Sequence, residues 1–98
     1  MRYVVNATET SDADVVAADA LRRVPPAALD AFQREALTNQ LRTALASLVE
    51  QGARLAAQGS QMRAERRVEV GGVQMLIRFN AGTKPSVWER LRRALGVS

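Results

Sequence analysis

The chain has 98 residues, a length that predicts one domain over residues 1–98 with a single modest core. It contains no cysteine and no histidine, which excludes disulfides and thiolate chemistry and removes the commonest metal ligand and general base. The net charge is +4, and no apolar run reaches the roughly 18 residues of a membrane span. We therefore expect a cytoplasmic protein without a metal or cofactor.

The basic residues concentrate in the last third of the chain. Residues 1–62 hold six arginines and seven acidic residues, a balance of −1, whereas residues 63–98 hold eight basic and three acidic residues, a balance of +5. Such asymmetry indicates a polyanion or an acidic partner, although a solvated basic face is the commoner explanation. Thirteen arginines against one lysine are typical of a GC-rich genome, so we expect a bacterial or phage source.

Residues 2–6 form a short β-prone run that places Tyr3 and Val5 on one face and Val4 on the other. We expect this run to supply a third strand beside the hairpin described below. The next predicted element is a helix over residues 12–23, with Ser11 as a capping residue. Two prolines, Pro25 and Pro26, end this helix.

Apolar residues at three- and four-residue spacing predict a long amphipathic helix over residues 26–57. At 1.5 Å per residue it would measure about 48 Å, against roughly 20 Å for the hairpin, so part of it needs another cover. Its second half carries a spacing typical of a helix pair. We predict a homodimer that pairs through this seam. The seam residues are Leu41, Leu45, Leu48, Gly52, Leu55 and Gly59.

The two glycines of the seam allow two interpretations. A glycine within a helix is costly, so close approach of a backbone or a bulky ring would explain Gly52 and Gly59. Alternatively, Gly52 is a tolerated flaw or a kink, and Gly59 is simply the end of the helix.

The segment over residues 66–79 predicts a β-hairpin around the pair Gly71-Gly72, because glycines suit a two-residue turn with positive φ. The turn fixes the register. Val70 lies opposite Val73, and each residue before Val70 lies opposite the residue equally far after Val73. One face is then apolar and must be covered by helices. The apolar residues of that face are Val68, Val70, Val73, Met75, Ile77 and Phe79.

A last helix over residues 87–95 is predicted by a capping box that starts at Ser86. Its apolar face, with Trp88, could cover the sheet or lie in a membrane interface, and we favour the first. The predicted fold class is α+β. A small antiparallel sheet, formed by the hairpin at 66–79 and a possible strand at 2–6, packs on the long helix and the C-terminal helix in the order β-α-α-β-β-α.

No spacing unites the remaining carboxylates and hydroxyls into a catalytic arrangement, so we do not expect an enzyme. We expect a non-catalytic interaction or regulatory module whose basic face meets an acidic protein. The alternative is a nucleic-acid-binding protein that uses the same residues for phosphate contacts. The candidate partner-binding or polyanion-binding residues are Arg63, Arg66, Arg67, Arg78, Lys84, Arg90, Arg92 and Arg93.

Overall fold

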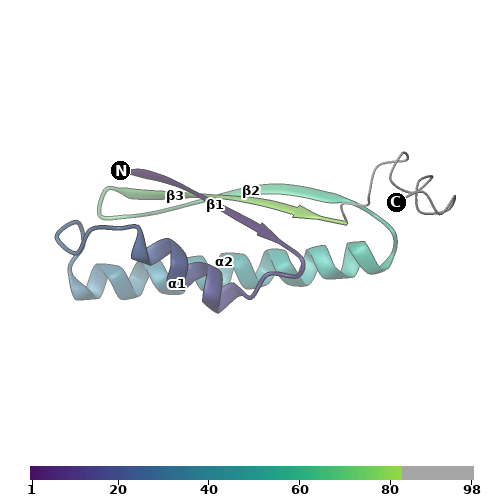
Figure 1. Ribbon diagram of the computed structural model, residues 1–98, viewed down its shortest axis with the longest axis horizontal. Coiled ribbons are helices and arrows are strands. Elements are labelled where there is room, and N and C mark those ends of the chain that lie inside the picture. The colour runs from purple at the N-terminus through teal and green to yellow at the C-terminus, as the bar shows by residue number, and fades with distance from the viewer. Residues whose placement is uncertain (83–98) are drawn as a thin grey trace, which may run out of the picture.

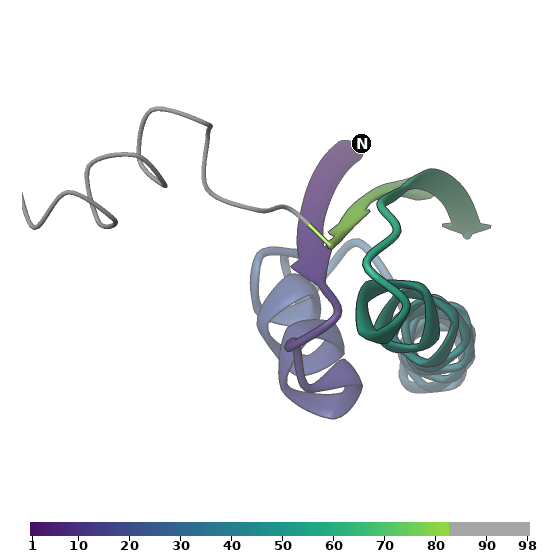
Figure 2. The ribbon, with the colours of Figure 1, turned by 90° about the vertical axis from the view of Figure 1, so that its right-hand side faces the viewer.

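A computed structural model describes residues 1–82 of the chain and shows an α+β fold in two layers (Figure 1). The elements are β1 (Arg2–Thr8), α1 (Ala13–Arg22), α2 (Ala31–Ala57), β2 (Met62–Val70) and β3 (Val73–Ala81). The three strands form one layer, and the two helices lie side by side beneath it (Figure 2). The predicted order of the first five elements is confirmed. The helix predicted over residues 87–95 lies outside the described residues.

The hairpin has the predicted register, with Val70 opposite Val73 and Arg66 opposite Ile77. Gly71 and Gly72 adopt φ angles of 57° and 82°, the positive values that a two-residue primed turn requires. Pairing continues past the predicted range of 66–79, because Met62 still lies opposite Ala81. The predicted apolar face is the one that packs on the helices.

The sheet is mixed, and the prediction of an antiparallel sheet is wrong for one of its two pairings. Strand order is β1-β3-β2, with β1 parallel to β3 and β2 antiparallel to β3. Successive elements reverse direction, so β1, α2 and β3 run the same way (Figure 1). β1 pairs with β3 and is therefore parallel to it. If β1 had paired with β2 instead, the sheet would have been antiparallel throughout.

The central position of β3 follows from its helix-facing side chains, which are all buried. They are Val73, Met75, Ile77, Phe79 and Ala81. On the same side of β2 only Val68 is buried, and the charged Arg66 interrupts the series. A strand with a charge on its inward face is best placed at an edge of a sheet, where the charge reaches water.

The first helix is capped by Asp12 and not by Ser11 as predicted. One oxygen of the Asp12 carboxylate accepts the backbone N–H groups of Asp14 and Val15 at 2.9 and 3.2 Å. The hydroxyl oxygen of Ser11 instead accepts the N–H of Thr8 and closes the turn after β1. A carboxylate suits the positive end of the helix dipole better than a neutral hydroxyl.

The long helix begins at Ala31, later than the predicted start at Pro26. Asp30 caps it, and its side chain and that of Gln33 each accept the other residue's backbone N–H. Phe32, predicted to lie on the apolar stripe, is 81% exposed. With 27 residues the helix measures about 40 Å, against about 30 Å for a nine-residue strand, so the predicted mismatch in length largely disappears.

The predicted dimer seam faces the chain's own sheet. Leu41, Leu45 and Leu48 are fully buried in the core between the layers, and Gly52 is buried beside them. The bulky ring that explains Gly52 is that of Phe79. Gly59 ends the helix, with φ at 77° and the next N–H, that of Ser60, donating to the Leu55 carbonyl. The spacing of the four buried residues therefore reflects packing of a helix on a sheet. Leu55 is half-buried and Gly59 is exposed, and the homodimer stays a prediction.

Candidate binding surface

The side chains on the sheet face opposite the helices form what we call the open sheet face. Within residues 1–82 both helices lie on the other face, and no element covers this one (Figure 2). Alternation along each strand assigns its residues. They are Arg2, Val4, Asn6 and Thr8 from β1, Gln74, Leu76, Arg78 and Asn80 from β3, and Arg63, Glu65, Arg67 and Glu69 from β2.

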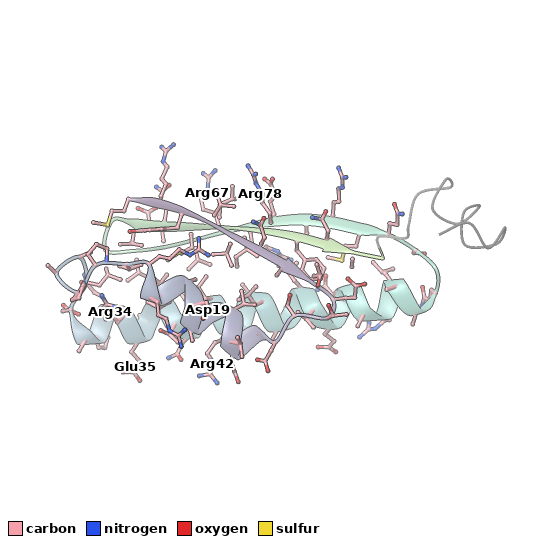
Figure 3. All side chains as sticks on the ribbon, in the orientation of Figure 1. Asp19, Arg34, Glu35, Arg42, Arg67 and Arg78 are labelled. Carbon is pink, nitrogen blue, oxygen red and sulfur yellow. The ribbon has the colours of Figure 1, made fainter. Side chains whose placement is uncertain are left out.

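Four arginines and two glutamates give the open sheet face a formal charge of +2. Arg67 and Arg78 point away from the helix layer (Figure 3). Arg78 lies opposite Glu65, with Nε 3.7 Å from a carboxylate oxygen, and both side chains are more than half exposed. Such an exposed pair contributes little to stability, and it leaves both groups accessible to a partner.

The arginines of the helix layer differ from those of the open sheet face, because several of them form ion pairs with acidic side chains. Arg42 Nε lies 2.7 Å from Asp14 Oδ1 and joins α2 to α1. Arg22 pairs with Asp19 within α1 at 3.0 Å. In contrast, the part of the chain that the structure describes provides no ion pair for the three other arginines of the open sheet face. These are Arg2, Arg63 and Arg67.

Two apolar side chains lie near the middle of the open sheet face. Val4, which is 39% exposed, is opposite the half-buried Leu76, and Leu76 is in turn opposite Arg67. Together with Arg2, Tyr3 and Gln74, these residues line a shallow depression. A second depression lies between β2 and β3 toward the other end of the face. The first one combines apolar surface with the guanidinium groups of Arg2 and Arg67, for which residues 1–82 provide no ion pair.

The structure brings together three of the predicted binding residues, Arg63, Arg67 and Arg78. Arg66 lies on the helix side of β2, opposite Ile77, and does not join them. The other predicted residues, Lys84, Arg90, Arg92 and Arg93, lie outside the described residues.

Sequence reasoning missed Arg2, Val4 and Leu76 as members of this surface. The alternation over residues 2–6 already separated Val4 from Tyr3 and Val5. Only the pairing of β1 with β3 shows that the Val4 side shares a face with Arg67. Alternation alone could have identified the surface had the strand order been known.

The core between the layers contains only apolar side chains. Within residues 1–82 no polar or charged side chain is buried, and no three acidic side chains gather as metal ligands would. In the same part of the chain, neither helix is both long enough and apolar enough to cross a bilayer. The polar chemistry of the described residues is therefore at the surface.

Comparisons with known proteins give no relative for this chain. No protein-family model matches it, and neither a curated protein nor a solved structure does. Its function must be argued from the geometry of the open sheet face.

Proposed function

We propose that this protein is a non-catalytic binding module that holds an acidic segment of another protein on its open sheet face. The observation that carries the proposal is the depression where Arg2 and Arg67 flank the exposed Val4 and the half-buried Leu76. The two arginines supply charge without a partner among the described residues, and the two apolar side chains supply contact area.

The spacing of these groups suits an extended peptide. Arg67 and Val4 lie on either side of Leu76, on strands about 4.8 Å apart, so the row spans about 10 Å across the sheet. An apolar side chain of the partner can contact Val4 and Leu76 while neighbouring carboxylates reach the guanidinium groups. Arginine binds carboxylates through two parallel hydrogen bonds, which gives such contacts direction as well as charge.

A nucleic-acid-binding function is the second candidate, because phosphate groups need only the same arginines. Proteins that bind single strands on a sheet also stack bases on exposed aromatic rings. Among the described residues, alternation assigns no aromatic residue to the open sheet face. Tyr3 borders the depression, but it lies on the helix side of β1 and is packed against the core. The surface therefore favours a protein partner over a nucleic acid.

The test compares two neighbouring arginines on opposite faces of one strand. A fluorescein-labelled peptide of eight glutamates with one central leucine serves as the probe, and anisotropy reports its binding to the full chain. Arg67→Gln should weaken binding about fivefold or more, the equivalent of roughly 1 kcal/mol. Arg66→Gln removes the same charge from the helix side and should leave the affinity nearly unchanged.

Two results would contradict the proposal. Equal losses in the two variants would mean that only net charge matters. Tighter binding of duplex DNA or single-stranded RNA than of the peptide, with a steep loss of affinity as salt rises, would favour the nucleic-acid function.

A further inference from the structure

The two edges of the sheet differ in how they are protected. The N–H of Gln74 donates to the Met1 carbonyl, so alternate carbonyls of β1, including that of Val4, point to the outer edge. Arg23 Nη1 donates to the Val4 carbonyl at 2.7 Å and occupies that edge. At the other edge, no strand within residues 1–82 pairs with the outer side of β2. The nine residues of β2 therefore offer a long edge for a further strand.

The hairpin turn determines which backbone groups of β2 face this edge. Val70 and Val73 flank a two-residue turn, so they exchange both of their backbone hydrogen bonds. The backbone N–H and C=O groups of every second residue before Val70 likewise point toward β3. Those of the intervening residues point away from β3, toward the free edge. The outward-facing residues are Arg63, Glu65, Arg67 and Glu69. Their charges alternate in sign along the strand.

We propose that a second copy of this chain pairs with β2 along this edge, antiparallel and about a twofold axis at Arg66. In this register all nine residues of each β2 are paired, since Met62 lies opposite Val70 of the other copy. Arg63 then faces Glu69 of the other copy, and Glu65 faces its Arg67. These are the outward-facing residues, so each of these pairs also exchanges backbone hydrogen bonds. The result is a continuous six-stranded sheet.

The alternating charges select this register over its neighbours. A slip of two residues in one direction would place Glu65 opposite its own counterpart and Arg63 opposite Arg67. A slip in the other direction would place Arg67 opposite its own counterpart and Glu65 opposite Glu69. Like charges directly opposite each other destabilise a sheet, whereas opposite charges stabilise it. Either slip replaces the four favourable pairs with three like-charge pairs.

On the helix side of the new pairing the side chains are mostly apolar. Met62 would face Val70 of the other copy, and Ala64 would face its Val68. Met62, Ala64 and Val70 are half-buried in one chain, so this pairing covers more of their apolar surface. The exception is Arg66, which meets Arg66 of the other copy at the axis. This single like-charge contact opposes four opposite-charge pairs and weakens the dimer without changing its register.

The helix beneath β2 leaves room for this approach. A groove between α2 and β2 is lined by Thr43 and Ala44, together with Asn39, Gln40 and Val68. Helices approach one another to 8–10 Å, and the side chains at the contact set the distance. The short side chains of Thr43 and Ala44 therefore permit a second α2 to lie alongside. The pairing would also join two open sheet faces, each with a charge of +2, into one surface.

Charge reversal on β2 tests the proposal through the mass of the full chain in sedimentation velocity. The wild type should sediment as a dimer of twice 10.7 kDa at micromolar concentration. Arg67→Glu should weaken self-association about tenfold or more, because Glu65 then faces a glutamate at two symmetric places. Glu65→Arg should do the same with arginines. A mixture of the two variants restores both opposite-charge pairs and should recover the dimer mass.

Two further variants act as controls. Arg22→Glu makes the same change of charge on α1 beneath β1 and should leave the dimer intact. Arg66→Thr removes the like-charge contact at the axis and should tighten the dimer.

Amide hydrogen exchange of the wild type gives an independent test that needs no substitution. The outward-facing amides of Arg63, Glu65, Arg67 and Glu69 should gain protection as concentration rises. A wild-type monomer at all concentrations would overturn the proposal. A dimer that survives Arg67→Glu unchanged, or four amides that exchange freely within it, would place the contact elsewhere and would also overturn it.

Discussion

Gly52 lies where α2 packs directly against Phe79 and Ala81 of β3. A Cβ atom added there would lie 2.5 Å from Phe79 Cζ and 2.8 Å from Ala81 Cβ. Phe79 is 1% exposed, so its ring is enclosed by the core and cannot move aside without disturbing its neighbours. The helix tolerates the conformational cost of a glycine because the missing side chain makes room for the largest ring of the core.

Replacing Gly52 with leucine should therefore lower the free energy of unfolding by about 2 kcal/mol or more, because overpacking outweighs the gain in helix propensity. Ala53→Leu provides the control, because position 53 is exposed. This substitution should change the free energy of unfolding by no more than about 0.5 kcal/mol. Urea unfolding followed by circular dichroism measures both values.

Repeating the Gly52→Leu substitution in a variant without the Phe79 ring tests whether that ring causes the loss of stability. In a Phe79→Leu variant the cost of Gly52→Leu should fall, because the smaller side chain leaves space and the two substitutions interact. The same cost in both backgrounds would show that Phe79 is not what excludes a side chain at position 52.

Among the elements, the hairpin is the one most completely determined by its own sequence. Its turn has two residues, both glycine with positive φ, and this length leaves only one register for the flanking strands. A Cβ added at Gly72 would meet nothing within 4 Å. Substitutions at Gly72 therefore report on backbone conformation alone.

Gly72→Asn should cost less than about 0.5 kcal/mol, because asparagine tolerates the left-handed region. Gly72→Val should cost about 1–2 kcal/mol, because a β-branched side chain does not. The comparison uses thermal unfolding of the two variants against the wild type. Equal melting temperatures for the two variants would mean that the turn does not keep its positive φ.

The sequence predicted those features that depend on residues close together in the chain. The hairpin register, the strand at residues 2–6 and the existence of both helices follow from local patterns. The start of α2 was missed because Pro26 and Asp30 are both good starting signals, and only the capping box of the structure distinguishes them. The spacing of Leu41, Leu45 and Leu48 suits either a second helix or a sheet, and periodicity cannot tell these apart.

At the scale of the whole molecule, the two-layer arrangement produces the candidate site. Two helices cover one face of a three-stranded sheet, and within the described residues the other face remains open (Figures 1 and 2). Arg2 and Arg67 lie near opposite ends of the described chain, and they share one surface only because β3 pairs with both of their strands. Strand order depends on competition between distant segments, so local patterns could not predict this surface.

We predict that the open sheet face, and not the helix layer, contacts the acidic partner. The most direct test is an NMR titration of the ¹⁵N-labelled full chain with the glutamate-leucine peptide. The largest shifts should occur at the amides of Val4, Arg67 and Leu76 and at the Nε groups of the open-face arginines. Shifts confined to α1 and α2 would contradict this prediction and would place the binding surface on the helix layer.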